Sequence, residues 1–279
     1  MARIIAAAQY AAAADFPTNL ERHLRYASAA ASLGVQLLVF PELSLTGYQL
    51  EYAAANPISP HSPALEPLRA AARELRITIL AGAPVQFGSA QPSIGQLAFL
   101  PDGLVVVHTK QHLAGAEFDH FQPGRGGPVL RIGALMVASA ICNDITHPEH
   151  AASAAAHRAT IYAASVLLRE QVYAAETAML AGYARQHGMT VVLANHAAET
   201  GGWLPAGRSA IWDEQGAQVA QSEGTEEALV LARRRGRNWE GAVFPLNQPM
   251  AAPRITIAAA EPAQPIAAPA VPAQGTLFG

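Results

Sequence analysis

The chain has 279 residues and a formal net charge of −3, with 51% hydrophobic and 14% charged residues. This length suits one large α/β domain and is marginal for two, and the composition excludes a chain that is disordered over most of its length. The near-neutral charge gives no electrostatic reason to expect nucleic acid or an anionic membrane as a partner. Polar residues interrupt every apolar stretch before about 18 residues, so we expect no membrane span.

Short β-rich runs alternate with Ala-rich helical runs along the chain, and strands outnumber helices. This pattern favours one layered α/β domain over 1–252, with helices outside and sheets inside. The segment 253–279 repeats proline in Ala-rich sequence and is expected to be an extended or disordered arm. We expect strands at 3–10, 35–42, 77–85, 94–100, 104–110, 129–142 (two, around Gly133), 159–165, 189–196, 208–213, 217–222 and 227–234, and helices from Thr18 or Asn19 to Gly34, at 62–75, at 147–157 and at 169–188.

Cysteine and lysine each occur once, as Cys142 and Lys110. A single cysteine excludes an internal disulfide and suits a reducing compartment, so we expect a cytoplasmic protein. Arginine is otherwise the standard cation here, so a retained lysine indicates a need for a compact ammonium. A surface lysine that was kept by chance explains the count at least as well.

Three strongly apolar strand patterns each end in a residue whose side chain could take part in catalysis, namely Glu42, Lys110 and Cys142. Desolvation beyond such a strand raises the pKa of a carboxylate toward that of a general base. Taken singly, a loop acid, a lysine at a strand end and a core cysteine are the commoner interpretations. Together they supply a nucleophile, a base and a cation for an oxyanion, which favours a catalytic set.

Three short segments contain these residues, and they occur in the order glutamate, lysine, cysteine. They are Phe40-Pro41-Glu42-Leu43, Lys110-Gln111-His112-Leu113 and Ile141-Cys142-Asn143-Asp144. A fourth segment, 207–216, belongs to the same pattern. Over about residues 3–233 the chain resembles the nitrilase superfamily of carbon–nitrogen hydrolases. The resemblance implies a four-layer α-β-β-α sandwich and a Glu-Lys-Cys triad. It also implies homodimers or higher homo-oligomers.

The resemblance further implies a role for each matched residue. Cys142 attacks a carbonyl carbon and forms a thioester, while Glu42 accepts the thiol proton and later activates water as co-substrate. Lys110 and the backbone N–H of Asn143 hold the oxyanion. Glu117 matches a further family glutamate that orients the lysine or the leaving amine, although a loop acid at a turn is nearly as good an interpretation. An ammonium beside a thiol lowers its pKa, so we expect Cys142 to be activated before substrate arrives.

The residues after the cysteine help to choose the reaction. Nitrilases of the family typically have Trp-Glu there, whereas Asn143-Asp144 favours hydrolysis of a small amide or N-carbamoyl compound. Tyr48, Ser165 and Val166 are predicted to line the pocket, with packing an equal alternative for Tyr48. In related family members a tyrosine is common at the position of Asn143, and an Asn-Pro pair is frequent at the position of Ser165-Val166. These departures leave the identity of the substrate undetermined by the sequence.

Other readings of the chain stay open as well. A nitrilase or a thioester-based acyltransferase would use the same triad, and a catalytically silent binding or scaffold protein would keep the fold. No phosphate-binding glycine loop is present, so no nucleotide cofactor is expected. His147, His150 and His157 lack a third ligand at a recognised spacing, so we expect exposed helix histidines and no metal.

Overall fold

The structure is a computed structural model that describes residues 3–88, 91–236 and 238–246. The predicted arm, 253–279, lies outside the described residues. The elements are β1 (Arg3–Gln9), α1 (Phe16–Ser32), β2 (Leu37–Val39), α2 (Leu50–Ala55), η1 (Pro63–Leu65), α3 (Glu66–Leu75), β3 (Thr78–Val85), β4 (Ser93–Phe99), β5 (Val105–Thr109), η2 (Gly115–Asp119), β6 (Leu130–Ile132), β7 (Leu135–Ile141), η3 (Cys142–Thr146), α4 (Pro148–Ala156), β8 (Ile161–Val166), α5 (Glu170–His187), β9 (Thr190–Asn195), β10 (Ala210–Trp212), β11 (Gln218–Gln221), β12 (Ala228–Arg235) and β13 (Asn238–Pro245), where η marks a 3₁₀ helix.

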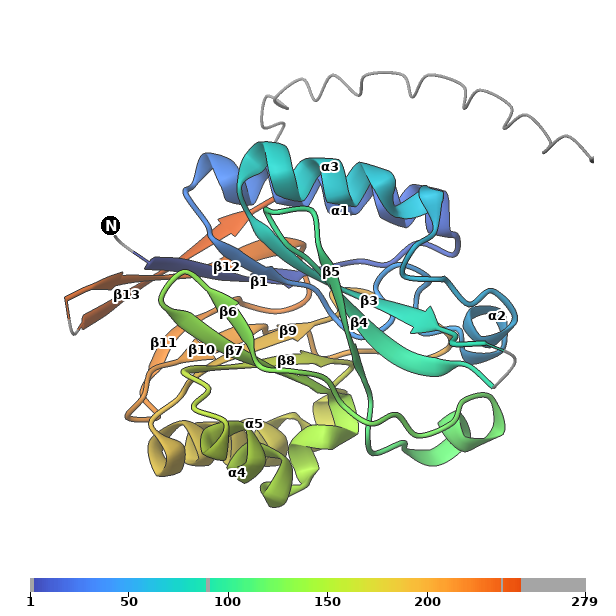
Figure 1. The fold of residues 1–279 in the computed structure, drawn as a ribbon. Helices are drawn as coiled ribbons and strands as arrows, with labels where there is room; N and C mark the ends of the chain where they lie inside the picture. Colours follow the sequence, from blue (N-terminus) through green and yellow to red (C-terminus); the bar gives the residue numbers. More distant parts are fainter. Residues whose placement is uncertain (1–2, 89–90, 237, 247–279) are drawn as a thin grey trace, which may run out of the picture.

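Two sheets stack face to face, and helices cover both outer faces (Figure 1). The strand order is β13-β12-β1-β2-β3-β4-β5 in one sheet and β11-β10-β9-β8-β7-β6 in the other. Helices α1 and α3 pack on the first sheet, and α4 and α5 pack on the second. This arrangement confirms the predicted four-layer α-β-β-α sandwich. Among the described helices, none is both long enough and apolar enough to cross a membrane.

The central strands bury both of their faces. In β1, Ile4 packs toward the helices, whereas its neighbour Ile5 packs between the two sheets. Val39 of β2 and Val137 of β7 meet in the same inter-sheet core. Because neither face reaches water, these strands are apolar throughout instead of alternating with polar residues.

The strand directions bring several carboxyl ends to one edge of the sandwich. Strands β1, β2 and β3 run parallel, as do β7, β8 and β9. Strand β5 is antiparallel to β4, which is antiparallel to β3, so β5 runs in the direction of β3. A parallel bridge between Tyr10 and His196 joins the ends of β1 and β9 across the two sheets. The residues that follow β2, β5, β7 and β9 therefore meet at this edge.

Three local features differ from the sequence prediction. Helix α1 begins earlier than expected, because the Asp15 carboxylate accepts the Thr18 N–H at 2.9 Å, while Asn19 is buried and binds the Tyr10 hydroxyl. The six-residue α2 is too short for a recognisable period. Strand β13 pairs with β12 along its whole length, but most of its residues are exposed, so its sequence has no apolar pattern.

Candidate active site

Glu42 lies in a tight turn just beyond β2. The turn needs a left-handed residue, Leu43, whose φ is +49°. It also approaches β3 closely, because a Cβ at Gly82 would lie 2.4 Å from the Leu43 nitrogen. His196, at the end of β9, places its Nε2 2.8 Å from the Glu42 carbonyl oxygen. This histidine was not among the predicted site residues, although it follows a fourth apolar strand just as the predicted residues do.

Cys142 is the first residue of η3 and directly follows β7. Its φ is +43°, a left-handed conformation that costs about 1–3 kcal/mol for a residue other than glycine. The half-buried side chain places Sγ 3.9 Å from the carbonyl oxygen of Leu167, beyond the end of β8. The strained turn thus presents the thiol at the edge where the strand ends meet.

Asp144 connects the cysteine turn to the lysine segment. Its Oδ1 accepts the backbone N–H groups of Gln111 at 3.1 Å and His112 at 2.9 Å. Its Oδ2 accepts the Ile141 N–H at 3.0 Å. One fully buried carboxylate therefore fixes the backbone on both sides of the site, a role that the sequence did not reveal.

Lys110 lies between two carboxylates in the buried centre of the site. Its Nζ donates to Glu42 Oε1 at 2.7 Å and to Glu117 Oε1 at 2.6 Å. The Tyr48 hydroxyl donates to the same Glu117 oxygen at 2.5 Å, and the Ala114 N–H donates to Glu117 Oε2 at 2.8 Å. The structure thus brings four of the predicted site residues into one hydrogen-bonded chain. Their catalytic roles stay predictions.

Burial sets the protonation of the Glu42 carboxyl. Desolvation raises the pKa of Glu42 to about 7, the nearby Lys110 ammonium opposes this rise, and Glu117 adds to it. Burial alone would lower the pKa of Lys110, but the negative charges around it outweigh burial and hold its pKa above the ordinary value. At neutral pH the site therefore combines a permanent ammonium with a carboxyl close to its titration midpoint, which suits a general base.

The expected activation of Cys142 before substrate arrives is wrong. Burial raises the pKa of Cys142 well above its ordinary value, and the Glu42 charge raises it further, so Lys110 does not compensate. At rest, Cys142 therefore carries a neutral thiol. The nearby thiol in turn lowers the pKa of Glu42. The second glutamate oxygen, Oε2, is buried with no hydrogen-bond partner among the described residues. This oxygen is free to accept a proton.

The surroundings of Cys142 are mainly apolar. Leu43, Leu113 and Leu167 are buried around it, together with Tyr48, and Trp203 packs on the edge of this cluster. Such walls exclude water and favour a short hydrocarbon group next to the thiol.

The other predicted pocket residues lie in different surroundings. The Asn143 side chain donates from Nδ2 to the Leu113 carbonyl oxygen at 3.2 Å, while its backbone follows the cysteine directly. Ser165 is fully buried and accepts a hydrogen bond from Gln96, and Val166 packs in the core beneath α4 and α5. Both lie at the end of β8, and their part in substrate binding stays a prediction.

A cavity of about 960 Å³ adjoins the cluster, with Arg169, Trp203 and Leu204 in its lining. The Arg169 guanidinium carbon lies 4.6 Å from the centre of the Trp203 ring. The lining contains none of Glu42, Lys110 and Cys142, so this cavity lies beside the thiol and not over it. Trp203 contacts both regions and connects them.

The three histidines that were expected to be exposed differ from one another. His157 is exposed, as predicted, and His147 is half-buried and stacks on His112 with ring centres 3.7 Å apart. His150 contradicts the prediction, because it is buried and its Nδ1 lies 2.8 Å from the Tyr162 hydroxyl. Burial lowers the pKa of His150 and that of the neighbouring His108, the latter to about 4.

Comparison with known proteins agrees with this geometry. Residues 4–238 match the carbon-nitrogen hydrolase family. The chain belongs to this family. The hydrolase is also similar to solved structures of an amidase of the nitrilase superfamily from Nesterenkonia sp. AN1. A cysteine-to-serine variant is 28% identical with a TM-score of 0.75, over 82% of this chain and 90% of that one. A double variant with acrylamide is 27% identical with a TM-score of 0.77, over 84% and 91%.

Two curated relatives are glutamine-dependent NAD(+) synthetases. The Thermotoga maritima protein is 31% identical over 48% of this chain and 24% of its own length. The Rhodobacter capsulatus protein is 27% identical over 76% of this chain and 40% of its own length. The hydrolase thus spans less than half the length of these relatives. The family and the amidase neighbours identify a carbon–nitrogen hydrolase, in which Glu42, Lys110 and Cys142 are all present.

Proposed function

We propose that this hydrolase cleaves a small aliphatic amide through a thioester on Cys142, with water as the second substrate. The observation that carries the proposal is the buried pair of Lys110 and Glu42, in which one glutamate oxygen beside the thiol has no hydrogen-bond partner among the described residues. A neutral thiol next to a carboxylate can lose its proton only as its sulfur attacks, which is the function of a general base.

The proposed acylation begins when Sγ of Cys142 bonds to the amide carbon and the thiol proton moves to Glu42. The electron pair of the carbonyl bond moves to oxygen, where Lys110 and the Asn143 N–H stabilise the negative charge. Glu42 then protonates the amide nitrogen, the C–N bond breaks and ammonia leaves. The acyl group is now held as a thioester.

Deacylation repeats these steps with water. Glu42 removes a proton from water, and the resulting oxygen nucleophile attacks the thioester carbon. When the C–S bond breaks, the sulfur regains a proton from Glu42 and a carboxylic acid leaves. The Lys110 ammonium and the Tyr48 hydroxyl both donate to the same Glu117 oxygen. Glu117 and Tyr48 therefore hold the ammonium in position during acylation and deacylation.

The apolar walls support a short hydrocarbon acyl group. The Nesterenkonia amidase has been solved with acrylamide and with butyramide, and both are small amides. A second candidate is an N-carbamoyl amino acid, which Arg169 favours because its guanidinium lies in the adjoining cavity and can pair with a carboxylate. Ser165 and Val166 are proposed to shape the inner end of the substrate pocket.

Three organisational features belong to the same proposal. We propose a hydrolase domain over 1–252. The single cysteine supports a cytoplasmic location. The resemblance to the family supports a homodimer or higher homo-oligomer, which light scattering would measure.

The test is ammonia release from a panel that contains propionamide, butyramide, glutamine, N-carbamoyl amino acids and propionitrile. We expect the aliphatic amides to have the highest kcat/KM and Cys142→Ala to release none. Arg169→Gln should raise KM only for the substrates that carry a carboxylate. If propionitrile were the best substrate, or if Cys142→Ala kept its rate, the proposal would be wrong.

A further inference from the structure

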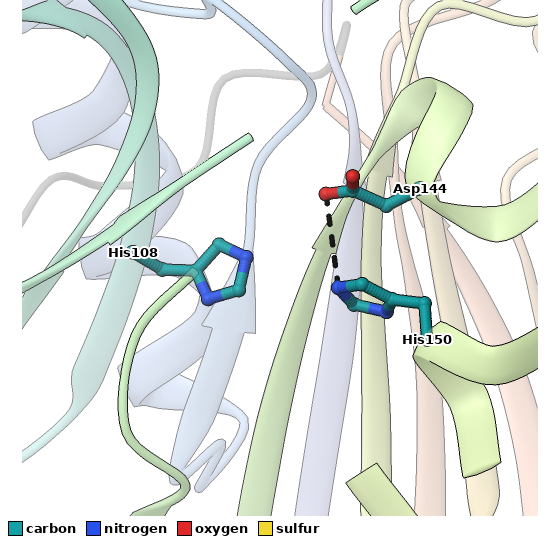
Figure 2. A group of neighbouring side chains, drawn as sticks. All are labelled: His108, Asp144 and His150. Carbon is teal, nitrogen blue, oxygen red and sulfur yellow. Dashed lines mark ion pairs between the residues drawn. The ribbon is translucent and has the colours of Figure 1, made fainter. Parts of the chain in front are cut away.

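A second group of side chains lies behind the cysteine turn. It consists of His108 on β5, Asp144 in η3 and His150 on α4, and all three are buried. One nitrogen or oxygen atom from each lies within 4.8 Å of those from the other two. Figure 2 shows the His150 and Asp144 side chains in contact, with His108 facing them from the opposite side. Neither histidine takes part in the proposed reaction.

His108 carries the strongest indication of a ligand. Its Nε2 is buried and has no hydrogen-bond partner among the described residues, and the residue as a whole is only 8% exposed. A buried polar atom without a partner is costly, and native structures usually explain it by a function or a bound group. The same histidine lines a cavity of about 490 Å³ together with His150, so a small ligand can reach both rings.

His150 and Asp144 are oriented by partners on their other sides. The Nδ1 of His150 lies 2.8 Å from the Tyr162 hydroxyl, which leaves Nε2 to face Asp144 Oδ2 at 3.8 Å. That distance is too long for a hydrogen bond but leaves room for a shared ion. Asp144 Oδ1 is held by backbone N–H groups, and Oδ2 also accepts the Ile141 N–H at 3.0 Å. Such supporting hydrogen bonds are typical of histidine and carboxylate ligands of metals.

We propose that His108, Asp144 and His150 bind one Zn²⁺ ion, with a water molecule from the cavity as the fourth ligand. Two imidazoles and one carboxylate form a donor set that suits zinc. Tetrahedral coordination at roughly 2.0 Å sets the ligand atoms about 3.3 Å apart, so separations of up to 4.8 Å must shrink by up to about 1.5 Å.

The ion would connect the parts of the chain that carry the catalytic residues. His108 lies two residues before Lys110, and Asp144 lies two residues after Cys142. The ion thus bridges β5, η3 and α4. We therefore assign it a structural role, so that bound zinc raises the thermal stability of the site.

The test measures Zn²⁺ binding by competition with a chromogenic chelator. Cys142→Ala serves as the parent, because it removes the thiol as an alternative ligand. We expect one ion per chain and a rise in the thermal midpoint with Zn²⁺. His108→Phe should weaken binding by about 100-fold or more and abolish that rise. The matched control is His157→Ala, an exposed histidine of the same cavity, which should bind like the parent.

Folding of the variant is checked separately. His108→Phe removes a ring nitrogen that has no hydrogen-bond partner among the described residues, so its thermal midpoint without metal should equal or exceed that of the parent. Unchanged zinc affinity in this folded variant would overturn the proposal, and so would an absence of zinc binding to the parent. A neighbouring group, the half-buried His112 and His147 with the exposed Glu149, offers the competing assignment. Loss of binding in His147→Ala but not in His108→Phe would move the site there and overturn ours.

Discussion

The rate of hydrolysis should report the titration of Glu42. Burial raises the pKa of this carboxyl to about 7, and only the carboxylate can accept the thiol proton. At about pH 5 a group with this pKa is about 1% ionised, whereas a carboxyl with an ordinary pKa is about 75% ionised. The value of kcat/KM should therefore fall about 100-fold between about pH 8 and about pH 5. Because the pKa values of Cys142 and Lys110 are both raised, no loss is expected up to about pH 9.

The assay is ammonia release from butyramide across this pH range, with activity after return to neutral pH as the control for unfolding. Glu117→Gln removes a negative charge that raises the pKa of Glu42 and should move the acid limb about one unit lower. An acid limb centred near 4.5, the ordinary value for a glutamate, would refute the argument that burial tunes the base. A decline centred below about pH 9 would refute the assigned neutral thiol or the permanent ammonium.

Three further substitutions test the site. Lys110→Arg should lower kcat/KM by at least about 1,000-fold, because the wider guanidinium cannot fit between the two carboxylates, and a loss below about tenfold in the ammonia assay would contradict the oxyanion role. Tyr48→Phe removes a hydrogen bond to Glu117 and should lower kcat by about tenfold with KM unchanged; steady-state rates equal to those of the parent would mean that Tyr48 only packs. Asp144→Asn places an amide donor against backbone N–H groups and should lower the free energy of unfolding by about 2–4 kcal/mol in urea, and a variant as stable as the parent would rule out the bridging role.

The sequence predicted the layered fold because a strand that is buried on both faces has a continuous run of apolar residues. Apolar strands followed by Glu42, Lys110 and Cys142 favoured a catalytic set of these three residues. Strand β13 has no such apolar run, because most of its residues face solvent and it is held by its pairing with β12. Helix α2 spans only six residues, which is too few for a period to appear.

The chemistry of the site was harder to predict than its members. The pKa of Cys142 depends on burial and on Glu42, which lies 100 positions earlier in the chain, and the lysine alone suggested the opposite direction. The bridging role of Asp144 and the approach of His196 to Glu42 join segments that are far apart in sequence. Likewise, the sequence predicts an exposed helix residue at His150, because its burial depends on the packing of α4 against Tyr162 on β8.

The most direct test of the account is the mass of the intact protein after rapid acid quench during turnover of butyramide. We expect the protein to gain the mass of the butyryl group less one hydrogen, with the modification on Cys142, and we expect Cys142→Ala to gain nothing. A hydrolase that releases ammonia without ever carrying this acyl group, or that carries it on another residue, would contradict the proposed thioester mechanism.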